Sequence, residues 1–362
     1  MTGDTQVDTG ADAHASVDAP ADVVADAPVD APAAVKELYF ITQQGFMPPL
    51  NDDLERVDLA RGAVTVDQPM NGALDVCYAG GNLYVVRGSG QARVSVLQLG
   101  TLNITSNIVL PADPAAAVFS ADCSSVFVGT SGGQIMQVGL PSGNAVGAPI
   151  SVPLPSGSSG SPQLTGLGID ASGTQLGVTE FSGSSSSVAI VYKAGSNWAL
   201  GLTVASQPVS GSNCGREAAS PAFSPDGTLL STFDPNCGTY DVYTVATGML
   251  NATVSAQFTR PSGVSFSGGS IWDHNNQVWS TNVSTVYRTS ETGMPATFPL
   301  PASAGALGLD DTGLVLYFVP YDPHTSGAYT IDTTTGATTA LGWNLGLVPS
   351  GSGVTRIRYV VR

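Results

Sequence analysis

The chain has 362 residues, only 11% of which are charged, and its formal net charge is −16. This acidity argues against a nucleic-acid partner, because nucleic-acid binding relies on clustered basic residues. No uninterrupted apolar run reaches the 18 residues typical of a membrane-spanning helix, and 43 glycines and 24 prolines break every candidate helix from residue 37 onward. The composition therefore favours an all-β protein.

Residues 1–36 consist mainly of Ala, Asp, Pro and Val and include no aromatic residue. Such a segment buries too little apolar surface to offset its ordering entropy, so we predict a disordered acidic tether over 1–36 and a separate folded domain over 37–362. The tether resembles the segment that follows the lipidated cysteine of bacterial surface lipoproteins. The resemblance implies export to the cell envelope or beyond, with a lipid anchor where Met1 stands. The alternative is a cytoplasmic protein with a disordered tail.

The stretch FSPDGTLLS at 223–231 has the form of a hairpin turn, with glycine four positions after an apolar lead residue and an apolar run behind it. The same form recurs along the chain, with Asn in place of glycine in one copy and Cys in another. The lead residues of the six copies are Cys77, Phe119, Ile169, Phe223, Trp272 and Leu309. Because two further β-rich runs follow each copy, the repeat predicts the four-stranded antiparallel blades of a propeller.

The two ends of the folded part supply one more blade. ELYFIT at 37–42 has the character of a second strand with no first strand before it, and SGVTRIRYVVR at 352–362 that of a first strand with nothing after it. Their pairing would close the ring and leave no free sheet edge. We therefore predict a seven-bladed propeller closed by the C-terminal strand, and six blades stay an alternative if one long unit is misread.

The four cysteines support export, because disulfides persist in oxidising compartments. Cys214 and Cys237 lie almost symmetrically about the FSPDGTLLS turn, which predicts a disulfide between the two ends of that hairpin. Cys77 ends a first strand and Cys123 stands at the turn position of the next blade. A second disulfide is therefore predicted between neighbouring blades. The alternative is buried free thiols in a reducing compartment.

Several units resemble the repeats of bacterial seven-bladed propellers of the lactonase (6-phosphogluconolactonase-like) type and of YVTN-repeat surface proteins. The segments that carry the likeness are FSPDGTLLSTF, SVAIVY at 187–192 after Glu180, and RVSVLQL at 93–99. The resemblance spans about 37–362 and implies the fold, whereas a fold alone does not define a function. The YVTN tetrapeptide is absent and several copies lack the Pro-Asp-Gly core, so no catalytic residue is carried over.

In such blades the loops after the second strand and before the first strand share one face of the ring, called here the loop face. The FSPDGTLLS-type turns lie on the other, the turn face. Polar side chains gather at the loop face, where the candidate ligand-binding residues are Arg87, Glu180, Arg216, Asp234, Tyr321 and His324. Arginines there can orient a carboxylate or sugar, with a carboxylate as acid or base. The alternative is a solvated rim whose salt bridges contribute little.

Three function classes follow. We expect an exported, monomeric propeller that binds a polar small molecule, a glycan or a surface protein at the channel mouth. The alternatives are a lactonase-like or other hydrolase acting on a small polar substrate there, and a purely structural surface protein. No catalytic residue is assigned and no cofactor is expected, because no His/Cys set has zinc or copper spacing. A structural Ca²⁺ bound by Asp-rich loops, for instance by Asp310 with Asp311, stays an alternative, although the spacing lacks the EF-hand pattern.

Overall fold

The protein was analysed as a computed structural model. It describes residues 35–44, 51–153, 162–182, 185–205, 219–234, 239–246, 249–257, 270–282, 285–289, 296–299, 305–320, 327–343, 345 and 352–361. The chain divides into two units, Met1–Ala34 and Val35–Arg362. The first unit lies outside the described residues, so the tether over 1–36 stays a prediction. Within the second unit, the first strand begins at Lys36.

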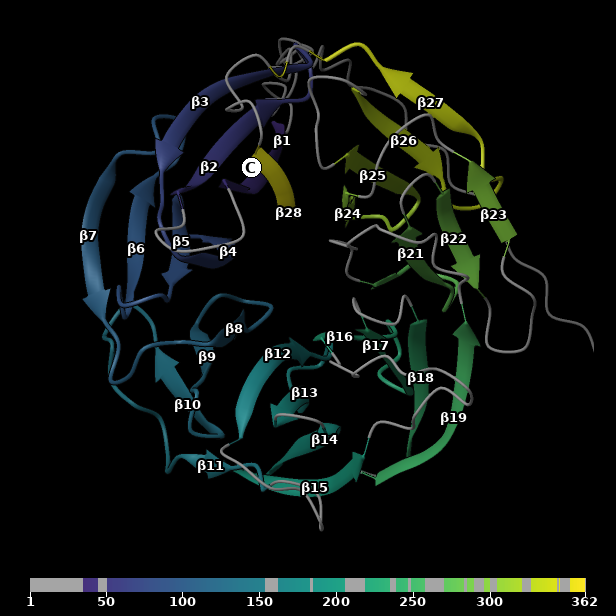
Figure 1. Cartoon of the computed structure of the whole chain (residues 1–362). Helices are drawn as coiled ribbons and strands as arrows, with labels where there is room; N and C mark the ends of the chain where they lie inside the picture. Colours follow the sequence, from purple (N-terminus) through teal and green to yellow (C-terminus); the bar gives the residue numbers. More distant parts are fainter. Residues whose placement is uncertain are drawn as a thin grey trace, which may run out of the picture. The chain divides into compact units, whose positions relative to one another are not determined.

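The second unit is an all-β ring of seven four-stranded antiparallel sheets, as predicted (Figure 1). Each sheet is one blade, and the innermost strand of each blade lies nearest the central channel. From the channel outward, blade 1 consists of β28 (Ser352–Val361), β1 (Lys36–Gln44), β2 (Asn51–Asp58) and β3 (Ala63–Pro69).

The other blades each use four consecutive strands. Blade 2 consists of β4 (Ala73–Ala79), β5 (Asn82–Arg87), β6 (Arg93–Gln98) and β7 (Ile104–Val109). Blade 3 consists of β8 (Ala116–Phe119), β9 (Ser125–Gly129), β10 (Gln134–Gly139) and β11 (Ile150–Ser151). Blade 4 consists of β12 (Gln163–Ile169), β13 (Gln175–Ser182), β14 (Ser185–Ala194) and β15 (Asn197–Ala205).

Blades 5 to 7 complete the ring in the same order. Blade 5 consists of β16 (Ala219–Phe223), β17 (Leu229–Asp234), β18 (Thr239–Ala246) and β19 (Met249–Gln257). Blade 6 consists of β20 (Ile271–Trp272), β21 (Val278–Asn282), β22 (Thr285–Thr289) and β23 (Ala296–Pro299). Blade 7 consists of β24 (Gly305–Leu309), β25 (Val315–Pro320), β26 (Ala328–Asp332) and β27 (Thr338–Leu341).

The predicted closure of the ring is confirmed. β28 pairs antiparallel with β1 along the whole strand, with Lys36 opposite Val361 and Gln44 opposite Ser352. The last strand of the chain thus becomes the innermost strand of the first blade. Because both ends of the folded unit share one sheet, β1 has a partner on its channel side and the ring is closed at this seam.

The core of the ring lies between the blades. Among the described residues, seven hydrophobic clusters form, one at each junction of neighbouring blades. At the junction of blades 7 and 1, for example, Phe40 and Val57 pack with Val319 and Ile357. Strand alternation explains this, because successive side chains point to the two neighbouring blades in turn.

The recurring FSPDGTLLS-type turn is a structural device of the ring. All six turn positions adopt a positive φ, which is 71° at Gly227 and 55° even at Cys123. In the FSPDGTLLS copy, one of two with Ser after the lead residue, Leu229 N–H donates to Ser224 Oγ (2.9 Å) and Thr228 N–H to Asp226 Oδ1 (3.0 Å). In other copies a single Asp at the Ser position receives both kinds of donor, as Asp170 does. The turns therefore satisfy their own backbone donors.

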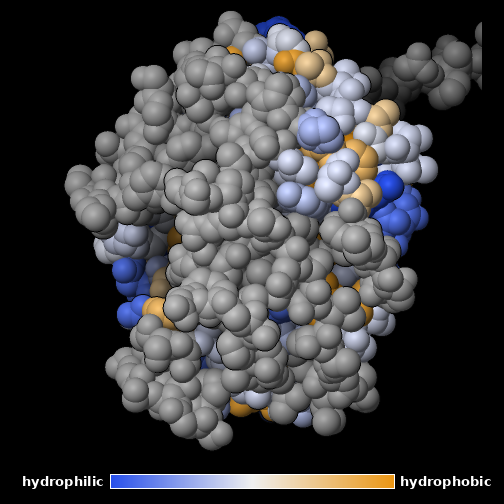
Figure 2. Space-filling model, turned by 45° about the vertical axis from the view of Figure 1, so that its right-hand side comes forward, coloured by the Kyte–Doolittle hydropathy of each residue, from blue (hydrophilic) through white to orange (hydrophobic). Residues whose placement is uncertain are grey.

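Neighbouring turns are also joined to one another. Asn276 Nδ2 of blade 6 donates to Asp226 Oδ2 of blade 5 (2.8 Å), and His274 Nδ1 lies 3.2 Å from Gly313 O of blade 7. Where the described residues are coloured in Figure 2, most are pale or blue, and orange residues form small separate areas. Large exposed apolar side chains such as Val109 are accordingly scattered.

Candidate functional site

The central channel contains a cavity of about 760 Å³. Its wall is formed by the innermost strands of all seven blades and by the turns that follow several of them. This volume lies in the range of small-molecule binding sites. Among the described lining residues, Arg356 and Arg358 carry the positive charge and Asp170 the negative charge. The Asp170 carboxylate accepts hydrogen bonds from its own turn, so the arginines are the charged groups that can meet a ligand.

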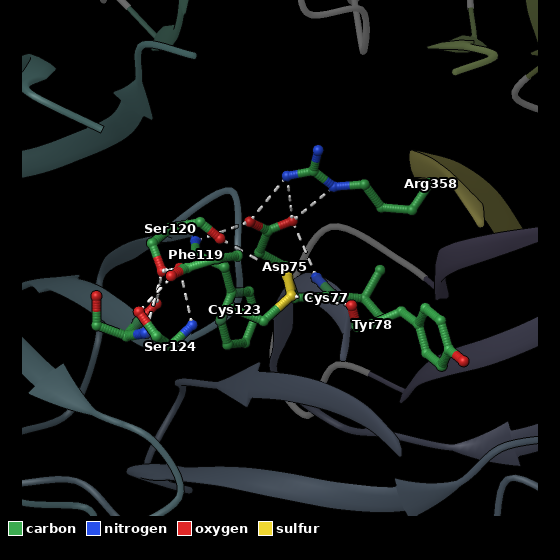
Figure 3. Close-up of a disulfide and its surroundings, with 11 residues drawn as sticks. Asp75, Cys77, Tyr78, Phe119, Ser120, Cys123, Ser124 and Arg358 are labelled. Atoms are coloured by element: carbon green, nitrogen blue, oxygen red, sulfur yellow. Dashed lines mark hydrogen bonds and ion pairs between the residues drawn. A yellow bond between two sulfur atoms is a disulfide. The ribbon is translucent and has the colours of Figure 1, made fainter. Parts of the chain in front are cut away.

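Both arginines belong to β28 and converge on one buried carboxylate of the neighbouring blade. Arg358 Nη2 lies 3.0 Å from Asp75 Oδ1 and 3.1 Å from Asp75 Oδ2, and Arg358 Nε lies 3.2 Å from Oδ1. Arg356 Nη1 lies 3.1 Å from the same Oδ1. The side chains of Arg356 and Arg358 are 36% and 43% exposed, whereas that of Asp75 is 0% exposed. Figure 3 shows Arg358 of β28 reaching Asp75 in the neighbouring blade.

The alternation of β28 explains why the two arginines act together. Ile357 packs between blades 7 and 1, while Val360 packs between blades 1 and 2. Arg356 and Arg358 share the parity of Val360, so they face blade 2, where β4 carries Asp75. The pairing between β4 and β5 shifts register between Ala73 and Asp75. The alternation of β28 thus places Arg356 and Arg358 on the side of the strand that faces Asp75 of β4.

Asp75 is held as a charged group. Besides the arginines, Val76 N–H donates to Oδ1 (2.9 Å) and Phe119 N–H to Oδ2 (3.4 Å). Burial opposes ionisation, but Arg358 and Arg356 outweigh it and hold the pKa of Asp75 below its ordinary value. One carboxylate cannot use every donor of two guanidinium groups. In the described part of the chain, Arg358 Nη1 and Arg356 Nη2 donate no hydrogen bond, so they can receive an anion from the channel.

A disulfide forms the neighbouring part of the wall. Cys77 is bonded to Cys123 with their Cα atoms 6.0 Å apart, which confirms the predicted link between blades 2 and 3. Both cysteines line the cavity, and Cys77 follows Asp75 by two residues on β4. Figure 3 shows the bond beside the Asp75 carboxylate. The predicted Cys214–Cys237 bond lies outside the described residues.

The opposite wall depends on a close approach of two innermost strands. A Cβ added at Gly168 of β12 would lie 2.1 Å from Pro221 O of β16. Glycine is therefore required where these strands cross. Ser220, which lines the cavity, adopts a φ of 51° beside this contact. In this part of the wall, the backbones of β12 and β16 are therefore closely packed.

The predicted loop-face residues are not the ones that line this cavity. Arg87 is buried at the end of β5, and its Nε donates to Asn71 O (2.9 Å). Glu180 is buried on β13; burial raises its pKa, and Ser187 Oγ donates to Oε2 (3.2 Å) while Oε1 has no partner. No contact between these two side chains is found in the described part. Asp234 ends β17, whereas Arg216, Tyr321 and His324 lie outside the described residues. The loop-face site stays a prediction.

Sequence reasoning missed Asp75, Arg356 and Arg358. The signal available was the alternation of two arginines in a strand already expected to line the channel of a charge-poor chain. Of the two Asp residues considered for a structural Ca²⁺, Asp310 binds backbone groups of its own turn. Asp310 Oδ1 accepts the N–H groups of Leu314 and Val315, both at 3.0 Å, and so closes its own turn.

Comparison with known proteins places the fold. No family model matches the chain, and no curated protein matches it. A protein from Lactobacillus plantarum matches with a TM-score of 0.63 at 12% identity, over 90% of this chain and 99% of that one. No helix in the described part is long and apolar enough to cross a membrane.

Two further solved structures carry a description of activity. One is a putative 6-phosphogluconolactonase from Bacteroides fragilis, with a TM-score of 0.62 at 15% identity over 92% of this chain and 100% of that one. The other is a periplasmic gluconolactonase from Pseudomonas aeruginosa, with a TM-score of 0.61 at 14% identity over 89% and 99%. The chain therefore has the fold of the lactonase-type seven-bladed propellers, as the resemblance of its repeats implied. Sequence identities this low establish a shared fold and do not establish a shared activity.

Proposed function

We propose that the propeller binds a small polar ligand with a carboxylate, of the sugar-acid class, in its central channel. The observation that carries the proposal is the pair Arg356 and Arg358, both partly exposed to a cavity and both anchored on the buried Asp75. Two guanidinium groups around one internal carboxylate keep a surplus positive charge. Because that carboxylate also fixes their orientation, less entropy is lost when a ligand carboxylate binds.

The charge of the chain adds to the argument. The protein as a whole carries −16, so an anion is repelled from most of its surface. A small anion therefore needs a local cationic site with directed donors, and arginine supplies them in a planar fork. The remaining lining mixes apolar residues with hydroxyl and backbone groups, which suits a ligand with a carbon skeleton and several hydroxyls.

Isothermal titration of the full chain with gluconate, glucuronate and neutral glucose tests the proposal. We expect the two acids to bind and glucose not to bind. Arg356→Ala should weaken binding about tenfold or more, since a charge-assisted hydrogen bond contributes about 1.5–3 kcal/mol. This variant keeps Asp75 paired with Arg358. Arg61→Ala, which removes an exposed arginine that is not part of the cavity lining, is the matched control.

The same titration separates the channel site from the predicted loop-face site. Binding that survives Arg356→Ala but fails in the double variant Glu180→Ala/Arg216→Ala would place the ligand at the loop face instead. If neither acid binds at millimolar concentration, the carboxylate proposal fails. Melting curves of each variant show whether lost binding reflects lost folding.

A lactonase is the second candidate. It is favoured by the described activities of two structures that share the fold, a gluconolactonase and a putative 6-phosphogluconolactonase. Opening of an aldonolactone produces an aldonate carboxylate, which is the group that the arginines would bind. Acid release from gluconolactone, followed at constant pH, tests this. A rate above the uncatalysed one that falls in Arg356→Ala supports hydrolysis, and a rate equal to buffer excludes it for this substrate.

We also infer that the protein works in an oxidising compartment outside the cytoplasm. The Cys77–Cys123 bond supports this, because disulfides are rare in reducing cytosol. Attachment by a lipid anchor, binding of a glycan or a surface protein, and a monomeric state remain predictions from the sequence. Fractionation of cells that express the full chain, with thiol trapping before lysis, tests the compartment. A fully reduced Cys77 and Cys123 in the cytosolic fraction would contradict export.

A further inference from the structure

A cluster of three carboxylates lies on the outer part of blade 1, away from the arginine pair. Asp53 and Glu55 are two residues apart on β2, and Asp67 of β3 stands directly opposite Glu55 in the strand register. One ligand oxygen from each of the three residues lies within 4.8 Å of the others. Because residues of one parity share a face, the three side chains project to the same side of the sheet.

That face is otherwise part of the core. Phe40 lies opposite Glu55 on β1, and Val57 follows Glu55 by two residues on β2. Both apolar side chains are fully buried between blades 1 and 7. Asp53 and Glu55 therefore occupy positions that continue a buried face, and they are themselves 7% and 0% exposed. Carboxylates at such positions are costly unless their charge is compensated.

The described residues supply this cluster with one hydrogen bond and no cation. In the ranges that the structure describes, no arginine or lysine forms an ion pair with Asp53, Glu55 or Asp67. Thr42 Oγ1 donates to Glu55 Oε1 (2.7 Å), whereas Glu55 Oε2 is buried and has no hydrogen-bond partner. A fully buried carboxylate oxygen without a donor, within a group of three carboxylates, is an arrangement that a bound cation would stabilise.

Two other buried acids of the ring are each paired with arginine. Glu37 of β1 is 1% exposed and is paired with Arg56 of β2. Asp75 is paired with Arg356 and Arg358. Each of these carboxylates receives an arginine from a neighbouring strand. At Asp53, Glu55 and Asp67, by contrast, three carboxylates converge and no arginine or lysine of the described residues pairs with them.

We propose that Asp53, Glu55 and Asp67 bind one Ca²⁺ ion at the outer part of blade 1. The donors are all carboxylate oxygens, without His or Cys, which is the set that hard cations prefer. Ca²⁺ accepts six to eight oxygens in flexible geometry, so water can complete the shell on the side of the exposed Asp67. The ion would supply the missing partner of Glu55 Oε2. Its position on β2, which pairs with β1, and on the outermost strand β3 would stabilise the blade that closes the ring.

The test uses the full chain after removal of metal with EDTA and dialysis. Melting temperature and isothermal titration are measured with CaCl₂, MgCl₂ and, at equal ionic strength, NaCl. We expect a saturable rise of the melting temperature with Ca²⁺, one ion per chain, and a weaker response to Mg²⁺. Glu55→Gln should lose the Ca²⁺ response yet melt no lower than the metal-free wild type, because it removes an uncompensated buried charge. Asp311→Asn, which removes one exposed acid elsewhere, should respond as the wild type does.

Three results would overturn the proposed site, and a fourth would overturn the choice of ion. The first is no saturable response to millimolar Ca²⁺. The second is an equal response in Glu55→Gln, which would place Ca²⁺ elsewhere. The third is a metal-free protein whose stability falls steeply between neutral and alkaline pH and is unaffected by Ca²⁺, which would show that shared protons, not an ion, neutralise the cluster. A preference for Mg²⁺ over Ca²⁺ would refute the assignment of the ion.

Discussion

Arg358 Nη2 lies 3.0 and 3.1 Å from the two oxygens of Asp75, across the boundary between blades 1 and 2. The arginine comes from the last strand of the chain and the aspartate from the first strand of blade 2, 283 positions earlier. This ion pair therefore adds a polar link beside the hydrogen-bonded seam at which β28 joins β1. The same groups form part of the channel wall, so the contact couples closure of the ring to the candidate ligand site.

Removal of the two partners should have unequal effects on stability. The double variant Arg356→Ala/Arg358→Ala leaves the fully buried Asp75 without a cation, which should cost about 3–5 kcal/mol of unfolding free energy. Asp75→Asn should cost less, because the freed arginines are partly exposed and regain water. Equilibrium unfolding in urea measures both. An Asp75→Asn variant as unstable as the double arginine variant would show that the shape of this contact matters more than its charge.

The same pair should make stability depend on pH in the acid range. The pKa of Asp75 in the folded state lies below its ordinary value of 3.8, because the arginines outweigh burial. A group with a lowered folded pKa stabilises fully above its unfolded pKa and loses this contribution as pH falls through the folded value. The melting temperature of the wild type should therefore fall more steeply below about pH 4 than that of Asp75→Asn. Parallel pH profiles would contradict this.

Much of the fold could be predicted because the repeat is local. The lead residues and the turn positions lie within five residues of one another, so Phe223 and Gly227 indicate a hairpin without knowledge of the rest of the chain. Closure required only the recognition that 37–42 and 352–362 each lack a partner. Cys123 at a turn position and Cys77 at a strand end then fell on neighbouring blades, and their disulfide followed.

The candidate site could not be predicted in the same way, because its groups meet only after the ring closes. Arg356 and Asp75 are 281 positions apart, and no local pattern joins them. The loop-face prediction considered charged residues at the ends of strands. It did not consider charged residues within an innermost strand, such as Arg356 and Arg358 of β28. The acidic cluster needed the register of β2 with β3, since Glu55 and Asp67 are opposite one another only in that alignment.

Deletion of 352–362 should abolish cooperative unfolding. The deletion removes the innermost strand of blade 1, the core residue Ile357 and both arginines that bind Asp75. β1 would then become an unpaired edge beside an open channel. Calorimetry or chemical denaturation should show a broad transition or none. A truncated protein that melts like the full chain would refute closure by this strand.

Removal of residues 1–34 serves as the matched truncation and should leave the melting temperature unchanged within about one degree. The segment is rich in Asp and Ala and has few groups that can pack. β1 begins at Lys36, so every described strand is retained. Resistance of this segment to protease, or a clear drop in melting temperature on its removal, would show that it packs on the propeller.

The Cys77–Cys123 disulfide should stabilise the protein measurably and in a reductant-dependent manner. It closes a segment of 46 residues, and on the chain-entropy model a loop of that length contributes about 4 kcal/mol. Because both cysteines line the cavity beside Asp75, their separation should also loosen the wall that holds the arginines. We expect the double variant Cys77→Ser/Cys123→Ser to melt lower than the wild type and to bind any channel ligand more weakly. Reductant should lower the melting temperature of the wild type more than that of the variant. A drop that remains in the variant reports on Cys214 and Cys237. Their predicted bond can be sought by peptide mapping without reduction. A double variant that keeps wild-type stability would mean that the strands of blades 2 and 3 hold this wall without the covalent link.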